Sequence, residues 1–367
     1  MTGKSKTLPS QDSYALVAKS SEVIEAPVLP YQPPMPADRS IPIALIGSGG
    51  IAAAHLEAYA KFGLNVALVC DRNLDRAEDR RDTYFPNARV STDANEAIKD
   101  PKIQVVDLAI HVDGRQPLIE LALNNGKHVL SQKPFVNDIP AGRRLADLAE
   151  EKGLHLAVNQ NGRWAPYMSY MREAVLAGVI GQVTGVHAAL QWDHTWIERT
   201  KFAEMEQVIL QDFAIHWFDF VASVIGDTAQ WIFASGTQTH GQSFNSNLAA
   251  QSVIGFPGGQ ASLVFDGAAK FGPQNSTTIV GTKGTLHSIG TDLGEQAVSV
   301  FVENGTGMPE LEGNWFNDGF AGTMGALLVA IESGVAPSNN ARDSLASLAL
   351  AHGAIESAKT GMVVRLR

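Results

Sequence analysis

An acid and an imidazole lie four residues apart in a stretch that otherwise favours burial. The segment LQDFAIHWFDF, residues 210–220, places Asp212, His216 and Asp219 among aromatic and aliphatic residues. On a helix, positions i and i+4 lie on the same side, so Asp212 and His216 would point into one space and Asp219 would continue the stripe. Taken alone, this pattern favours a core helix with a few hydrogen-bonded polar groups.

Two kinds of chemistry would use such a pair. An imidazole whose unperturbed pKa lies near the working pH can take a proton from a hydroxyl group. Carboxylates and an imidazole at this spacing can also chelate a metal ion, but a catalytic zinc site takes three protein ligands, and no further ligand cluster is evident. We therefore expect acid-base chemistry and no metal site.

Lys133 is the second residue whose setting suggests chemistry. It directly follows the apolar run HVLSQ and precedes Pro134, which biases the residue before it towards extended geometry. A lysine restrained in this way can hold an oxygen atom on which negative charge develops. On spacing alone, an ordinary surface lysine at a strand end is the commoner case.

A glycine turn near residue 47 predicts a nucleotide site. An apolar strand over Ile41–Ile46 precedes it, and the residues from Ile51 up to Gly63 strongly favour a helix. The glycine spacing, ending at Ala52, fits the dinucleotide fingerprint, in which a tight turn lets a pyrophosphate approach the first N–H groups of a helix. The glycines could merely turn the chain, but the order of elements favours dinucleotide binding. The residues predicted to contact the coenzyme here are Gly47, Gly49, Gly50 and Ile51.

The next strand favours NAD over NADP. Residues 65–70 form a second apolar strand that ends in Asp71, and an acid at this spacing can hydrogen-bond the adenosine ribose. A carboxylate opposes a 2'-phosphate, whereas the neighbouring Arg72 could stack on adenine or pair with that phosphate. We expect NAD as the cofactor, and NADP remains an alternative.

Apolar strands then alternate with helical segments as far as the run HLAVNQ. Such alternation predicts an α/β fold with a parallel, doubly wound sheet, whose ligands bind at the carboxyl ends of the strands. The residues that follow those ends, beyond the glycine turn, are Asp71, His111, Gln132 and Lys133.

The order of these motifs resembles a known family. The glycine turn, Asp71, the run NNGKHVLSQKPF and the Asp212 to Asp219 pattern resemble the glucose-fructose oxidoreductase, inositol dehydrogenase and rhizopine catabolism (Gfo/Idh/MocA) family. The resemblance covers roughly residues 41–367. It implies a nicotinamide-binding Rossmann domain followed by an α+β domain, whose large open, mainly antiparallel sheet often forms the subunit interface.

The resemblance also implies roles for three residues. The lysine of the family's EKP motif maps onto Lys133, and its acid and histidine map onto Asp212 and His216, which act around the hydroxyl that is oxidised. We expect His216 to be the general base, Lys133 to hold the reacting oxygen, and Asp212 to orient His216 or bind an adjacent hydroxyl. Three departures concern neighbours: Gln132 replaces a glutamate, Arg115 a frequent histidine, and Ala214 a frequent glycine.

A second domain begins at the end of the run NQNGRW. Its period-two strands followed by two helices suit an α+β domain, and we divide the chain into an arm or linker (1–40), a Rossmann domain (41–163) and a substrate and oligomerisation domain (164–367). Polyhydroxylated substrates need hydrogen-bonding groups and an aromatic face. The candidates are Arg163, Trp192 and His194.

The composition limits the partners. Asp and Glu (38) outnumber Lys and Arg (28), no basic stripe is present, and we expect no nucleic acid partner. The single Cys70 and the lack of a secretory signal or an 18-residue apolar run favour a cytoplasmic protein with no membrane segment. Through the resemblance we expect a homodimer or homotetramer built on the C-terminal sheet.

The hypothesis from the sequence is an NAD(P)-dependent oxidoreductase acting on a secondary hydroxyl of a cyclic polyol, sugar or sugar derivative. One alternative is an NAD-using glycosidase of the same fold, which oxidises its sugar only transiently. Another is a non-catalytic NAD-binding ligand sensor, although the joint presence of Lys133, Asp212 and His216 disfavours it.

Overall fold

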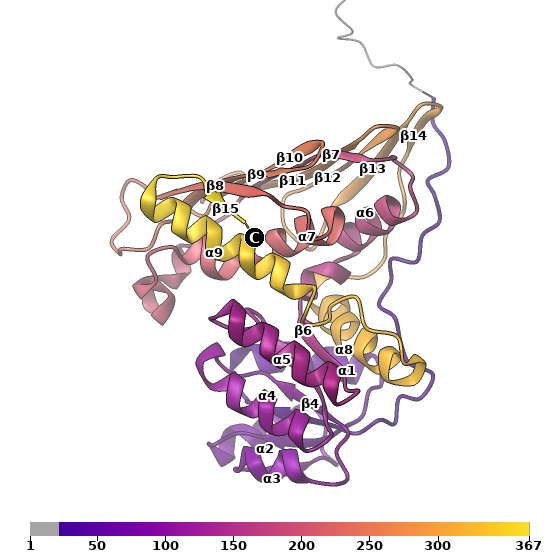
Figure 1. The fold of residues 1–367 in the computed structure, drawn as a ribbon, viewed down its shortest axis with the longest axis vertical. Coiled ribbons are helices and arrows are strands. Elements are labelled where there is room, and N and C mark those ends of the chain that lie inside the picture. Colours follow the sequence, from indigo (N-terminus) through magenta and orange to yellow (C-terminus); the bar gives the residue numbers. More distant parts are fainter. Residues whose placement is uncertain (1–21, 367) are drawn as a thin grey trace, which may run out of the picture.

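The structure, a computed structural model, describes residues 22–366 and contains two sheets with helices packed on them (Figure 1). The first sheet has six parallel strands in the order β3-β2-β1-β4-β5-β6, which confirms the predicted doubly wound Rossmann arrangement. Its strands are β1 (Ile43–Ile46), β2 (Val66–Cys70), β3 (Arg89–Ser91), β4 (Val105–Leu108), β5 (His128–Gln132) and β6 (Leu156–Asn159). Its helices are α1 (Gly50–Lys61), α2 (Leu74–Tyr84), α3 (Ala94–Lys99), α4 (Arg115–Asn124) and α5 (Ile139–Glu151), with the turn η1 (Val112–Gly114).

The second sheet has nine strands and is antiparallel except where β7 pairs with β10, as expected for the α+β domain. Its strands are β7 (Val183–Gln191), β8 (Trp231–Thr237), β9 (Ala249–Phe256), β10 (Gly259–Asp266), β11 (Gln274–Gly281), β12 (Gly284–Gly290), β13 (Ala297–Val302), β14 (Gly305–Gly307) and β15 (Val364–Arg365). Gly258, at φ +81°, turns the predicted β9–β10 hairpin.

Helices cover one face of the nine-stranded sheet (Figure 1). These are α6 (Pro166–Leu176), α7 (Ile215–Ile225) and α9 (Ser344–Thr360), together with the short turns η2 (Asn161–Trp164), η3 (Thr195–Arg199), η4 (Lys201–Glu204) and η5 (Ile209–Phe213). On the opposite face, large apolar side chains alternate with buried ones along their strands and are 38 to 42% exposed: Phe233, Val264, Ile289 and Phe301.

Helix α8 (Trp315–Ser333) joins the two halves of the chain. It belongs to the second predicted domain in sequence, yet it packs against α1, and its apolar residues enter the core around β1 (Figure 1). Phe320 and Met324 on this helix are fully buried there. The helix is apolar on nearly all faces, so it can be buried between the two sheets.

The part of the predicted arm that the structure describes, residues 22–40, lies along its own chain (Figure 1). Val23 forms a bridge with Thr306 at the edge of β14, and Pro27 O accepts a hydrogen bond from Tyr170 Oη at 2.8 Å. The backbone N–H groups of Ala37 and Asp38 donate to Glu332 on α8. The rest of the predicted arm, residues 1–21, lies outside the described residues. Within residues 22–366, no helix is long and apolar enough to span a bilayer.

Candidate active site

The glycine turn leaves room for a phosphate at the start of α1. Gly47 has φ +102°, and a Cβ there would lie 2.5 Å from Ile110 Cγ2, so only glycine fits. A Cβ on Gly49 or Gly50 would meet no atom within 4 Å. The first turn of α1 has no side-chain cap, and Ser48 Oγ is buried without a hydrogen-bond partner. These free donors beside open space fit a pyrophosphate group.

Asp71 directly follows β2 and lies beside this turn. Its carboxylate accepts from the backbone N–H of Ser48 at 2.7 Å and from that of Asn73 at 2.9 Å. Arg72 is exposed next to it. The side chain of His111, at the end of β4, is also exposed and lies 3.1 Å from Asp113. The structure therefore places the predicted coenzyme residues at the carboxyl ends of β1, β2 and β4.

Lys133 and Asp212, predicted from separate segments, meet between the two sheets. Lys133 Nζ donates to Asp212 Oδ1 and to Asp212 O, both at 2.9 Å. Burial by itself would raise the pKa of the Asp212 carboxyl, but the charge and hydrogen bond of Lys133 lower it below its usual value. This ion pair therefore holds Asp212 ionised and Lys133 fixed at the end of β5.

The helix that carries Asp212 is not the regular one that the sequence predicted. Residues Ile209–Phe213 form a π turn, closed by the Ala214 N–H donating to Ile209 O at 2.7 Å, before α7 begins at Ile215. The extra residue in the turn alters the side-chain directions that an i, i+4 spacing would produce. Asp212 therefore points to Lys133, and His216 follows it on α7.

His216 is neutral and has an unpartnered nitrogen. Burial, and then the charge of Lys133, lower the pKa of the imidazole to about 3, although Asp212 opposes this shift. Its Nδ1 is buried without a hydrogen-bond partner, and its ring contacts Trp315 edge to face. The unpartnered nitrogen of the neutral ring can therefore accept a proton.

Aromatic side chains lie beside Asp212 and Lys133. Trp192 stacks on Phe213 with ring centroids 4.1 Å apart and donates from Nε1 to His194 Nδ1 at 2.9 Å. Burial lowers the pKa of His194 to about 4, while the nearby Asp212 opposes the shift. Because Nδ1 accepts from Trp192, the proton of the neutral ring is on Nε2. Trp192 and His194 thus combine an aromatic face with a hydrogen-bond donor.

Arg163 and Asp219 lie in a different environment from the one the sequence suggested. Arg163 Nε and Nη2 each donate to the Asp219 carboxylate at 2.7 Å, and Nη1 donates to Ser338 O. Both side chains are almost fully buried. Asp219 therefore does not extend the Asp212 and His216 stripe, and Arg163 would have to leave this ion pair to bind a substrate.

Sequence reasoning missed two aromatic residues of the site, Trp315 beside His216 and Phe213 beside Trp192. Trp315, at the start of α8, donates from Nε1 to Asn161 Oδ1 at 2.8 Å, and Phe213 stacks on Trp217 behind Trp192. Trp315 lies in the polar stretch EGNWFND and Phe213 follows Asp212, and neither position carries a motif that distinguishes it from a core residue.

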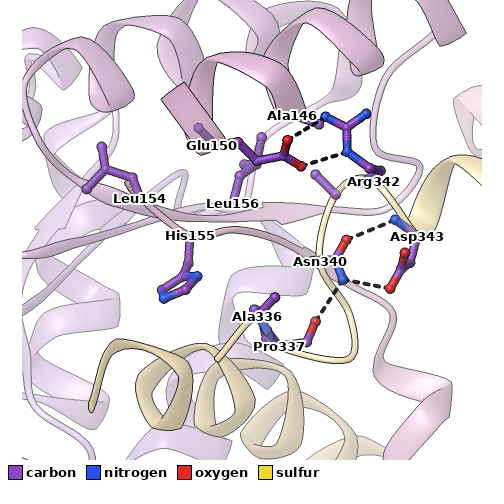
Figure 2. A pocket seen from close by; sticks show the side chains of 12 residues that line it. Ala146, Glu150, Leu154, His155, Leu156, Ala336, Pro337, Asn340, Arg342 and Asp343 are labelled. Carbon is purple, nitrogen blue, oxygen red and sulfur yellow. Dashed lines mark hydrogen bonds and ion pairs between the residues drawn. The ribbon is translucent and has the colours of Figure 1, made fainter. Parts of the chain in front are cut away.

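A separate pocket of about 350 Å³ lies between α5 and the segment that precedes α9 (Figure 2). Arg342 pairs with Glu150 across it, and His155 lies at the amino end of β6. The amino and carboxyl ends of parallel strands lie at opposite edges of a sheet, so this pocket is remote from Lys133.

Comparison with known proteins agrees with this arrangement. Residues 41–160 match the oxidoreductase family with the NAD-binding Rossmann fold, and residues 168–287 match the GFO/IDH/MocA C-terminal domain. The chain belongs to the Gfo/Idh/MocA family. The resemblance inferred from the motif order is thereby confirmed, and the chain is an NAD-binding dehydrogenase.

Related proteins match nearly the whole chain. A D-apiose dehydrogenase of Rhizobium rhizogenes is 25% identical over 341 residues, which cover 88% of this chain and 96% of that enzyme. An oxidoreductase from Agrobacterium radiobacter, solved with NAD+, L-tartaric acid and magnesium, superposes with a TM-score of 0.80 at 22% identity over 89% of this chain and 98% of that one. A levoglucosan dehydrogenase, solved with NADH and levoglucosan, has a TM-score of 0.76 at 18% identity. The match covers 89% of this chain and 99% of that one. These two structures show the same fold.

Proposed function

We propose that this Gfo/Idh/MocA chain oxidises a secondary hydroxyl of a cyclic polyol, sugar or sugar derivative, with NAD+ as the hydride acceptor. The observation that carries the proposal is the Lys133 to Asp212 ion pair beside the unpartnered nitrogen of His216. The aromatic face of Trp192 next to the donor of His194 suits a ring that carries hydroxyl groups. Named relatives that act on sugars include D-apiose dehydrogenase and 1,5-anhydro-D-fructose reductase of Ensifer adhaerens.

Lys133, His216 and Asp212 would divide the reaction between them. The bound nicotinamide supplies the hydride acceptor. Lys133 holds the reacting oxygen and stabilises the negative charge that develops on it, while His216 receives the hydroxyl proton. Loss of the proton and the hydride converts the alcohol carbon into a carbonyl.

The charge of Lys133 explains how an imidazole with so low a pKa could act as the base. Burial contributes most to the low value, and the Lys133 ammonium adds to it. A negative oxygen on Lys133 would offset that ammonium charge, so the imidazole would become more basic as the hydroxyl proton leaves. Asp212, which accepts from Lys133 at 2.9 Å, would then stabilise the protonated ring.

The test is a coenzyme-reduction screen over inositols, aldoses, aldonates and amino-sugar derivatives. We expect a free polyol or sugar to reduce added NAD+ in proportion to turnover. Release of an aglycone from a glycoside without net NADH would identify the glycosidase alternative. Ligand-dependent changes in Tm without either product would identify a sensor.

We also infer that the uncovered face of the nine-stranded sheet forms a homodimer or homotetramer. Its exposed apolar residues lie on different strands of that one face, which makes it unsuited to remain in water. Phe233→Lys together with Val264→Asp should reduce the molecular mass measured by light scattering to that of the single chain. An unchanged mass would assign the contact to another surface.

A further inference from the structure

A buried polar network lies behind Lys133 in the Rossmann domain. His55 on α1 places Nδ1 2.8 Å from Asp107 Oδ2 on β4, and Tyr59 Oη donates to the same oxygen at 2.7 Å. All three residues are 0% exposed. Polar groups buried this deeply lower stability unless their hydrogen bonds are satisfied, so the arrangement needs an explanation.

Gln132 connects this network to the backbone of Lys133. Gln132 Oε1 accepts from the Lys133 N–H at 2.6 Å, and Gln132 Nε2 lies 3.3 Å from His55 Nε2. Asn159 Nδ2, at the end of β6, lies 3.1 Å from the same imidazole nitrogen. A continuous chain of hydrogen bonds therefore runs from Asp107 through His55 and Gln132 to Lys133.

The donors and acceptors in this chain determine the state of His55. The Lys133 N–H can only donate, so Gln132 must present its oxygen to Lys133 and its NH2 group to His55. His55 Nε2 must then accept, which leaves the proton on Nδ1, facing the Asp107 carboxylate. An imidazolium would direct its Nε2–H at the NH2 groups of Gln132 and Asn159, which are themselves donors. The arrangement therefore requires a neutral imidazole.

The carbonyl group of Lys133 is held from the other side. Arg115 Nη2 donates to Lys133 O at 3.4 Å and Nη1 donates to Ser131 Oγ at 3.3 Å. Arg115 is 1% exposed, and burial lowers the pKa of its guanidinium to about 9. Both backbone polar groups of Lys133 are thus bonded to buried side chains. The two positions involved, 115 and 132, are those at which the chain departs from the family pattern around Lys133.

The second half of the molecule packs on the same network. The ring of Phe320 on α8 lies 4.6 Å from the ring of His55. Lys133 meets Asp212 from the second half at its Nζ end. The network and the ion pair therefore restrain opposite ends of one residue.

We propose that the chain Asp107–His55–Gln132, with His55 as the neutral Nδ1–H tautomer, positions the backbone of Lys133 so that its ammonium reaches Asp212. The proposal rests on the proposed function only where it concerns turnover. His55, Asp107 and Gln132 are positioning residues, because they act on Lys133 through its backbone N–H.

The first experiment measures the tautomer directly and needs no substrate. In protein carrying 15N-labelled histidine, with NAD+ bound, long-range proton–nitrogen correlations distinguish Nδ1–H, Nε2–H and imidazolium rings. His55, one of ten histidines, is assigned by the shift of its signals in Asp107→Asn. We expect the Nδ1–H form at pH 7, and an imidazolium or Nε2–H ring would overturn the proposal.

Gln132→Glu gives the sharper comparison. A glutamate at this position can still accept from the Lys133 N–H, but its second oxygen has no proton to give to His55. We therefore expect His55 to become an imidazolium between two carboxylates in this variant. A neutral Nδ1–H ring that persists in Gln132→Glu would contradict the assigned direction of the hydrogen bonds.

The second experiment tests positioning with the substrate found in the coenzyme-reduction screen. Gln132→Met removes both hydrogen bonds and should lower kcat by roughly ten- to a hundredfold, with little change in KM for NAD+, because misplacement of a reacting group has effects of this size. Gln132→Glu should lower kcat less than Gln132→Met does, because it keeps an acceptor for the Lys133 N–H. The acid limb of the pH–rate profile of Gln132→Glu should shift to higher pH, because the added negative charge favours the protonated forms of nearby groups.

Tyr59→Phe and Tyr170→Phe form a matched pair that separates positioning from plain stability. Each removes one buried tyrosine hydroxyl that donates a hydrogen bond, to Asp107 in the first and to Pro27 O in the second. We expect both to lower Tm, and only Tyr59→Phe to lower kcat per folded molecule. Equal, unchanged kcat in both, with Gln132→Met also unchanged, would reduce the network to a structural role. Full turnover in Lys133→Met would instead contradict the proposed function and leave the tautomer result intact.

Discussion

Lys133 Nζ lies 2.9 Å from both the carboxylate and the main-chain oxygen of Asp212, so one side chain joins the end of β5 to the π turn before α7. The two residues come from different halves of the chain. Any change in how the halves pack would alter this pair, and the geometry of the proposed site depends on it.

Replacement of Lys133 or His216 should separate coenzyme binding from chemistry. Lys133→Met and His216→Gln keep similar bulk, so NAD+ affinity and Tm should change little, while turnover falls by roughly 10²- to 10⁴-fold, as is typical for lost acid-base catalysis. Tm, NAD+ titration and turnover are measured on the same samples. If His216 is only a core residue, His216→Gln will lower Tm and leave turnover per folded molecule nearly unchanged.

Coenzyme preference should depend on Asp71. Asp71→Ser removes the carboxylate that opposes a 2'-phosphate and that accepts from the Ser48 N–H, so NAD+ should bind more weakly, and NADP+ relatively better with the help of Arg72. Asp93→Ser is the matched control, since Asp93 also follows a strand and also accepts from the backbone N–H two residues further on. Equal losses of affinity for NAD+ and NADP+ in binding titrations would rule out Asp71 as the residue that sets coenzyme preference.

The role of Arg163 can be decided by a pair of substitutions. Arg163→Met leaves Asp219, which is 2% exposed, without its partner, and should lower the free energy of unfolding by about 3 to 5 kcal/mol. Arg163→Met combined with Asp219→Leu should recover much of this loss. A recovered protein with normal KM for its substrate would show that Arg163 is structural. A raised KM in the same protein would support the predicted substrate contact.

The arm should contribute to stability and not to coenzyme binding. A truncated chain beginning at Asp38 loses the bridge to β14 and the contact between Pro27 and Tyr170, so its Tm should fall. It retains the glycine turn and should bind NAD+ with unchanged affinity in a titration. Weaker binding by a folded truncated chain would place part of the arm at the coenzyme site.

Stability should fall as the pH drops below about 6.5. Burial lowers the pKa of His128 and His194 from 6.5 to about 4, and that of His216 to about 3. Between these values and 6.5 the unfolded chain binds protons that the folded chain does not, so stability falls with pH, by at most about 1.4 kcal/mol per pH unit for a histidine that stays neutral in the fold and by less for the partly exposed His128. Urea unfolding at pH 7.5, 6.0 and 5.0 measures the slope. His194→Gln should reduce it, and an unchanged slope would contradict the buried neutral state.

Much of the nucleotide half could be predicted from sequence because its signals are local. Gly47 is required by its own φ and by the residues that follow β4, and apolar strands that alternate with helices have few other stable arrangements. The order of Asp71, Lys133, Asp212 and His216 along the chain also sufficed to recognise the family.

Only the tertiary structure decided which buried polar groups pair. From spacing, Asp219 was expected beside His216, yet it pairs with Arg163, and the π turn that directs Asp212 to Lys133 has no signature in the residues around it. Likewise, nothing in the sequence distinguishes His55 from other residues of α1. Its role depends on Asp107 and Gln132, which β4 and β5 place against it. The physical reason is that backbone conformation is set largely by neighbours in sequence, whereas a buried charge or imidazole is stabilised by partners that reach it only when distant elements pack together.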